Sequence, residues 1–130
     1  MAGLVRLLVV DDDRELQRMV QRYADKVGGY VIEQALDGEG GLEAARARRP
    51  DLILLDVSMP RMDGRDLLKR LKADPALADI PVIMFSARSE QSDRLVGLEL
   101  GADDYIEKPF HFEMLFRRIA HRIEKARGAG

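Results

Sequence analysis

The stretch VRLLVVDDDREL (residues 5–16) joins an apolar run to three consecutive carboxylates, Asp11, Asp12 and Asp13. The apolar part is nearly continuous in Val and Leu, which is typical of a parallel strand that is covered on both faces. The acidic part is unexpected at the end of such a strand, because neighbouring carboxylates repel one another and are poorly hydrated at the edge of a core. The stretch therefore raises the question of what stabilises this charge.

Short apolar runs and segments with helical spacing alternate along the rest of the chain. The predicted strands are residues 4–10, 30–35, 51–57, 80–86 and 104–108. The helical stripes consist of Leu16, Met19, Val20, Tyr23 and Val27; of Leu67, Leu68 and Leu71; and of Leu115, Ile119 and Ile123. Residues 38–48 are predicted as a weaker helix, because three glycines lie in or near its first turn. Five strands alternating with five helices predict a doubly wound parallel sheet of the α/β class.

Length, composition and charge restrict the class of protein. The 130 residues suffice for one domain with its own core, and the absence of cysteine excludes disulfides and thiolate metal sites. With 21 basic and 23 acidic residues, the formal charge of −2 gives no reason to expect direct binding to nucleic acid. The apolar start is too short for a secretory signal or a membrane span. We expect a soluble cytoplasmic domain over residues 1–127, with residues 128–130 as a frayed tail or truncated linker.

Polar side chains follow the strands that we expect at the centre of the sheet. Asp11 and Asp12 follow the first strand, Asp56 the third, Ser86 the fourth and Lys108 the fifth. In doubly wound sheets, binding sites form outside the carboxyl ends of the strands. Three carboxylates gathered there need a cation, and Mg²⁺ suits a small acidic site because it takes one or two carboxylates and keeps several waters. An ammonium and a hydroxyl beside it would suit the oxygens of a phosphoryl group.

Each of these residues taken singly has an ordinary structural explanation. Carboxylates after a strand commonly cap the next helix, and Asp13 is predicted to do so. Lys108 and Pro109 alone would be typical of a turn. The combination of residue types at one edge of the sheet, rather than any one residue, favours phosphoryl chemistry.

Four segments, in this order and spacing, resemble the receiver domain of bacterial two-component response regulators. They are LLVVDDD, DLILLDVSMPRMDG, PVIMFSA and GADDYIEKPF, and the resemblance covers essentially the whole chain. It implies the CheY-like, flavodoxin-like (βα)5 fold, a three-layer α/β/α arrangement with strand order 2-1-3-4-5. It also implies a signalling domain rather than an enzyme, with self-catalysed phosphotransfer and autodephosphorylation only.

The resemblance assigns a role to each polar residue at the predicted edge. Asp56 would accept a phosphoryl group from the phosphohistidine of a sensor histidine kinase or a histidine phosphotransfer protein. Asp11, Asp12 and Asp56, together with the backbone carbonyl of Ser58, would hold Mg²⁺ or Mn²⁺. Lys108 would neutralise a phosphoryl oxygen during the transfer.

The resemblance further implies a switch built from Ser86 and Tyr105. The Ser86 hydroxyl would move to the new phosphoryl group and leave space for Tyr105, which couples the site to the surface of helix four, strand five and helix five. The peptide bond between Lys108 and Pro109 is expected to be cis.

Three positions depart from the family pattern or leave a role open. Ser86 stands where Thr is more usual, so that the hydroxyl is kept without the methyl group. Ser58 and Arg88 correspond to positions that flank the path of attacking water, where Arg88 either shields the phosphoryl group or is solvated. His111 stands where a helix cap is expected and is predicted to be a surface residue.

The output of the domain is left open by the sequence. GLELGADDYIEKPF is similar to receivers of transcription factors, in which Asp103, Asp104 and Arg118 would form ion pairs between the chains of a homodimer. Ordinary solvated charges explain these residues equally well. LKADPALADIPV is instead similar to stand-alone or hybrid receivers. Any effector domain is expected outside this chain.

The strongest rival is a haloacid-dehalogenase-like phosphatase with Asp11 as the nucleophile of an Asp-x-Asp motif completed by Asp13. The chain lacks the Thr expected after that motif, and Asp56 would have no role. A flavodoxin-like flavin binder shares the fold, but three carboxylates after the first strand would repel the flavin phosphate. No G-x-x-x-x-G-K-[ST] motif for a nucleotide is present.

Overall fold

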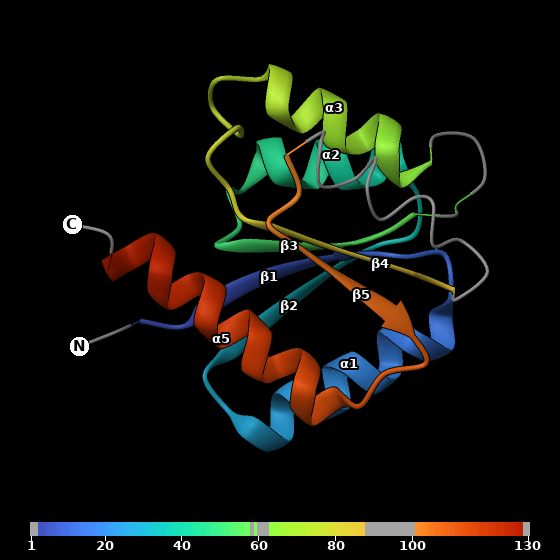
Figure 1. Cartoon of the computed structure of the whole chain (residues 1–130), viewed down its shortest axis with the longest axis vertical. Coiled ribbons are helices and arrows are strands. Elements are labelled where there is room, and N and C mark those ends of the chain that lie inside the picture. The colour runs from blue at the N-terminus through green and yellow to red at the C-terminus, as the bar shows by residue number, and fades with distance from the viewer. Residues whose placement is uncertain (1–2, 58, 60–62, 88–100, 129–130) are drawn as a thin grey trace.

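The computed structural model of the chain describes residues 3–57, 59, 63–87 and 101–128. The elements follow in the order β1 (Val5–Val10), α1 (Arg14–Val27), β2 (Tyr30–Ala35), α2 (Gly38–Ala47), β3 (Leu52–Asp56), α3 (Gly64–Ala73), β4 (Val82–Ala87), β5 (Asp104–Lys108) and α5 (Phe112–Gly128). The sheet lies between two helical layers, with α2 and α3 on one face and α1 and α5 on the other (Figure 1). The predicted fourth helix lies outside the described residues.

The sheet has five strands in the order β2-β1-β3-β4-β5, and every neighbouring pair is parallel. The predicted doubly wound α/β fold and its strand order are therefore confirmed. β1 has β2 on one side and β3 on the other, so the strand order reverses there. In sheets of this kind, a site is expected at the carboxyl end of that point of reversal.

Side chains along each central strand alternate between two cores. On β1, Leu8 and Val10 pack in the core beneath α2 and α3, whereas Leu7 and Val9 pack in the core beneath α1 and α5. All five residues of β3 are buried as well. Because both faces of these strands are covered, their sequences are apolar without alternation, as the opening stretch predicted.

The glycines of α2 allow the helix to pack closely on the sheet. A Cβ atom added to Gly41 would lie 2.8 Å from Val10 Cγ2, so a larger residue would push the helix away from β1. Asp37 caps the first turn by accepting a hydrogen bond of 2.7 Å from the backbone N–H of Gly40. The weakness predicted for this helix from its glycines is thus balanced by its packing and its cap.

The boundaries of the elements differ from the sequence prediction by one or two residues. β2 and β5 match it, whereas β1, β3 and β4 begin one or two residues later than predicted. α5 continues to Gly128, the first residue of the predicted tail. Among the helices in the described part of the chain, none has the length and hydrophobicity that crossing a membrane requires.

Candidate functional site

Three carboxylates meet at the carboxyl edge of the sheet, where β1 and β3 end side by side. The register pairs Val10 with Leu55, so Asp11 and Asp56, the residues that follow them, are neighbours. Asp11 is 0% exposed and Asp56 5%, whereas Asp12 is exposed. One oxygen from each of Asp11, Asp12 and Asp56 lies within 4.8 Å of the others. The predicted metal-binding residues are therefore close enough to share one cation.

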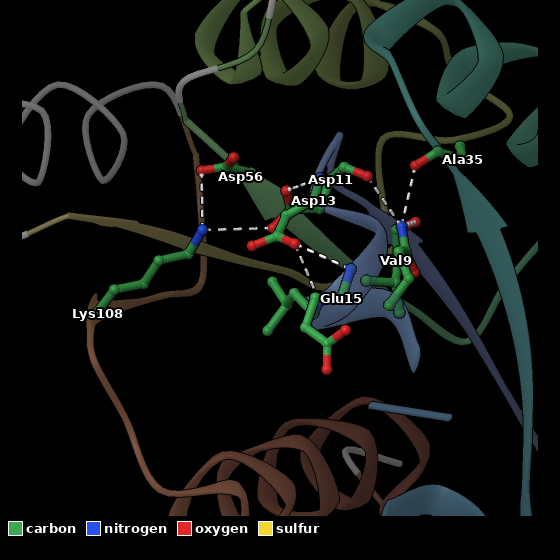
Figure 2. Close-up of polar contacts among 9 residues, drawn as sticks. Val9, Asp11, Asp13, Glu15, Ala35, Asp56 and Lys108 are labelled. Atoms are coloured by element: carbon green, nitrogen blue, oxygen red, sulfur yellow. Dashed lines mark hydrogen bonds and ion pairs between the residues drawn. The ribbon is translucent and has the colours of Figure 1, made fainter. Parts of the chain in front are cut away.

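Lys108 brings a positive charge to this cluster from β5. Its Nζ lies 3.4 Å from Asp11 Oδ2 and 3.7 Å from Asp56 Oδ1. Figure 2 marks both contacts with dashed lines. The ammonium also lies over the ring of Phe85, 4.9 Å from its centroid. Because β4 separates β5 from β3, only a long side chain can reach the two carboxylates. The fold thus joins the ends of β1, β3 and β5 in one site.

Burial controls the electrostatics of Asp11. It raises the pKa of the Asp11 carboxyl above the ordinary value, and the charge of Asp12 acts in the same direction. The backbone N–H of Asp13, which donates to Asp11 Oδ1 at 2.9 Å, and the ammonium of Lys108 oppose this shift. A divalent cation at the cluster would stabilise the ionised carboxylate that burial disfavours.

The three consecutive acids of the opening stretch have different surroundings. The carboxylate of Asp13 accepts hydrogen bonds from the backbone N–H groups of Glu15 and Leu16, at 2.9 and 3.2 Å, and caps α1 (Figure 2). This confirms its predicted role as a helix cap. It also leaves the rival Asp-x-Asp arrangement without its second carboxylate, because Asp13 is directed at the helix. Asp11 and Asp12 remain at the edge of the sheet.

Ser86 and Tyr105 lie together at the ends of β4 and β5. The Ser86 side chain is buried, and its hydroxyl is hydrogen-bonded to the Tyr105 hydroxyl. Ser86 directly follows Phe85, which pairs with Asp56 in the register of β3 and β4. The two residues predicted to form a switch are therefore in contact, one strand away from Asp56.

The remaining residues singled out in the sequence divide into three groups. The Lys108–Pro109 peptide bond is cis, as expected. His111 is exposed, which confirms that it is a surface residue. Ser58 and Arg88 lie outside the described residues.

The acids proposed to pair between chains have partners within this chain. Asp104 Oδ1 lies 3.0 Å from Arg118 Nη1, and Asp104 Oδ2 lies 3.9 Å from Arg122 Nε. Asp103 Oδ2 accepts a hydrogen bond of 2.8 Å from the backbone N–H of Val82. These contacts account for the positions of both acids inside one domain.

Two residues close to the site were not singled out by sequence reasoning. A Cβ atom on Gly64 would lie 2.3 Å from the backbone oxygen of Asp56, so only glycine lets the chain return beneath this residue. Gln17 is 1% exposed and contacts the ends of β1 and β2. The predicted apolar stripe of α1 did not include it: Met19 and Val27 of that stripe are exposed, and the buried face consists of Gln17, Val20 and Ala24.

Comparisons with known proteins agree with this arrangement. The family model for the response regulator receiver domain matches residues 7–120. The response regulator MprA of Mycobacterium ulcerans is 40% identical over 123 residues, which are 95% of this chain and 52% of that protein. The chain thus spans about half the length of the curated relatives that it matches.

Solved structures extend the likeness to three dimensions. A CheY-like response regulator receiver domain protein from Methanospirillum hungatei has a TM-score of 0.88 and 28% identity, covering 98% of this chain and 100% of that one. Chemotaxis protein CheY4 of Vibrio cholerae has a TM-score of 0.84 and 28% identity, covering 92% of this chain and 98% of that one. With the acidic edge and the strand order, these matches show that the chain belongs to the response regulator receiver domain family of two-component systems.

Proposed function

We propose that this receiver domain accepts a phosphoryl group on Asp56 from a phosphohistidine of a sensor histidine kinase or a histidine phosphotransfer protein. The observation that carries the proposal is the position of Asp56 between two acids and an ammonium. Its carboxylate shares the edge of the sheet with Asp11 and Asp12 and lies 3.7 Å from Lys108 Nζ. Receiver domains of response regulators work with sensor histidine kinases, which supply such a donor.

In the proposed step, one carboxylate oxygen of Asp56 attacks the phosphorus atom of the phosphohistidine. A P–O bond forms, the P–N bond breaks, and the imidazole leaves with the electron pair of that bond. Lys108 is positioned to meet the negative charge on a phosphoryl oxygen, since its Nζ already lies between Asp11 and Asp56. The Ser86 hydroxyl is proposed to donate a hydrogen bond to the phosphoryl group after transfer.

The donor set fits a small hard cation. Asp11, Asp12 and Asp56 offer carboxylate oxygens, the ligand type that Mg²⁺ and Mn²⁺ prefer, and the exposure of Asp12 leaves room for retained waters. We propose that these three residues and the Ser58 carbonyl hold the ion. Bound there, the ion would reduce the repulsion between the attacking carboxylate and the incoming phosphoryl oxygens. In its absence, Lys108 is the cation that the described residues bring to Asp11 and Asp56.

The contact between Ser86 and Tyr105 is proposed to couple the site to the output surface. If the Ser86 hydroxyl turns to a phosphoryl oxygen, the position of its partner Tyr105 on β5 changes with it. β5 also carries Asp104, which pairs with Arg118 on α5. If Asp103, Asp104 and Arg118 instead formed ion pairs between two chains, they would hold together the homodimer that the resemblance to transcription-factor receivers implies.

The remaining proposals concern the domain as a whole. We propose a single receiver domain over residues 1–127 that acts in the cytoplasm as a signalling domain. Its chemistry would be limited to self-catalysed transfer of a phosphoryl group from the donor and to loss of that group by hydrolysis.

The test is covalent labelling with acetyl phosphate in the presence of Mg²⁺, followed by mass spectrometry of the intact protein and its peptides. We expect one phosphoryl group on Asp56, and none in Asp56→Asn. Asp13→Ser is the matched control, because it removes a neighbouring carboxylate while serine still caps α1; it should be labelled like the wild type. A label on Asp11 that survives Asp56→Asn would reject the proposal in favour of the phosphatase mechanism.

A further inference from the structure

Gln17 on α1 has a buried side-chain amide directed at the edge of the sheet that carries the acidic site. Its Nε2 lies 2.9 Å from the carbonyl oxygen of Val9 and 3.1 Å from those of Asp11 and Ala35. These three carbonyls belong to the carboxyl ends of β1 and β2. Figure 2 labels Val9, Asp11 and Ala35, the three residues whose carbonyls accept these hydrogen bonds.

These contacts fix the backbone of Asp11 on both sides. The N–H of Asp11 donates to the carbonyl of Ala35 at 3.0 Å, and the carbonyl of Asp11 accepts from Gln17. Ala35 O also accepts from Gln17, so one amide joins the two strands where β1 ends. The Asp11 carboxylate extends from this fixed segment towards Asp13 N and Lys108 Nζ. A shift of the segment would move the carboxylate away from Asp12 and Asp56.

Packing alone does not explain a glutamine at this position. The side chain is 1% exposed, and its Oε1 is buried with no hydrogen-bond partner among the residues that the structure describes. An unpaired buried oxygen destabilises the fold, whereas an apolar side chain of the same length would avoid that penalty. The amide donor must therefore contribute something that an apolar residue cannot.

We propose that Gln17 is a positioning residue for the cation site, because its amide fixes the Asp11 backbone and thereby sets the Asp11 carboxylate for a divalent ion. The inference rests on the proposed function for its biological meaning. Hydrogen-bond partners behind metal ligands orient those ligands, and their loss commonly weakens metal binding. Gln17 would act in this way through the main chain of the ligand rather than through its side chain.

The first test compares Mg²⁺ binding by the wild type and by Gln17→Met, which has nearly the same shape but no donor. Calorimetric titration should give a half-saturating Mg²⁺ concentration about tenfold higher in Gln17→Met, with one site per folded molecule retained. The control is Ile119→Val, which weakens the same core without contacting the site. Its half-saturating concentration should equal that of the wild type. An unchanged value in Gln17→Met overturns the inference.

The second test reads the Asp11 backbone without any metal. Amide hydrogen exchange at Asp11 should be about tenfold faster in Gln17→Met than in the wild type, and unchanged in Ile119→Val. Gln17→Leu, a second variant with neither donor nor acceptor, should show the same faster exchange as Gln17→Met. Wild-type exchange at Asp11 in the methionine and leucine variants would contradict a role for the donor.

These readouts separate the inference from the proposed function. Gln17→Met should still be labelled on Asp56 when Mg²⁺ is saturating, because the nucleophile is untouched. Should the wild type take no label on Asp56, the proposed function fails, while exchange at Asp11 still decides whether Gln17 positions that residue.

Discussion

Aspartates lie both at the amino ends and at the carboxyl ends of the parallel strands, which form two opposite edges of the sheet. Their surroundings differ between the amino edge and the carboxyl edge. At the amino edge, Asp51 and Arg6 exchange two hydrogen bonds of 2.8 Å, from Arg6 N to Asp51 Oδ2 and from Asp51 N to Arg6 O. Asp103 and Val82 repeat the same pair of bonds at 2.8 Å each. At the carboxyl edge, Asp11 and Asp56 instead lie beside one another with Asp12 close by.

The difference separates structural acids from acids that are suited to chemistry. An aspartate at the amino edge satisfies the free backbone groups of a strand that is about to enter the sheet. At the carboxyl edge, Asp11 and Asp56 are crowded and buried, so a divalent cation that joins them would stabilise their charge. The neighbours of an aspartate at the end of a strand therefore decide whether its role is structural or chemical.

The largest effect expected from this comparison is on cation binding. Asp11→Asn should weaken Mg²⁺ binding by more than the about 10–100-fold loss typical of an outer partner, because it removes a proposed ligand. Asp51→Asn, at the amino edge, should leave the affinity unchanged. Calorimetric titration of both variants measures this. Equal losses in the two would mean that total negative charge, rather than the arrangement at the carboxyl edge, attracts the ion.

The second prediction reverses the comparison and concerns the free energy of unfolding. Asp51→Ala should destabilise the metal-free protein by about 1–3 kcal/mol, because the Arg6 N–H loses its acceptor. Asp51→Asn keeps an acceptor oxygen and loses the exposed ion pair with Arg127, at 3.4 Å, so its effect should be below about 1 kcal/mol. Urea unfolding monitored by circular dichroism gives both values. If the alanine and asparagine variants are equally destabilised, the ion pair is the important contact.

Much of this contrast was accessible from the sequence. Continuous apolar runs ending in Asp11 and Asp56 predicted adjacent parallel strands and a shared acidic edge, because residues that end neighbouring strands must meet. The structural use of Asp51 and Asp103 was not predicted, since it depends on which backbone group lies opposite each side chain. Gln17 was missed for the same reason: a polar residue beside an apolar stripe does not reveal three carbonyls from two strands.

A third prediction uses pH to compare Asp11 with Asp63, the cap of α3. For Asp63, partial burial alone would raise the pKa, but N–H groups of Asp66 and Arg65 and the Arg65 guanidinium outweigh it and lower the pKa of the carboxyl. A lowered pKa contributes stability that is present above the ordinary value of 3.8 and is lost as the pH falls through the folded-state value. A raised pKa does the opposite.

For Asp11, burial raises the pKa, so its contribution to stability is present below 3.8 and is lost as the pH rises through the folded-state value. Urea unfolding of metal-free protein at several pH values, with Asp11→Asn and Asp63→Asn as references, measures each contribution. The wild type should lose stability relative to Asp11→Asn as the pH rises, and gain stability relative to Asp63→Asn. Matching signs for the two residues would show that the crowding at the carboxyl edge is already compensated without a cation.

The smallest effect is expected at Asp12, the exposed member of the acidic cluster. Asp12→Ala should raise the stability of the metal-free protein, because it removes one like charge beside Asp11 and Asp56, but by less than about 1 kcal/mol since water screens the site. The same variant should bind Mg²⁺ more weakly and lose the stabilisation that the ion gives the wild type. Thermal unfolding with and without Mg²⁺ tests both statements. A variant that unfolds more easily than the metal-free wild type would give Asp12 a structural role like that of Asp51, and the two edges would no longer differ in kind.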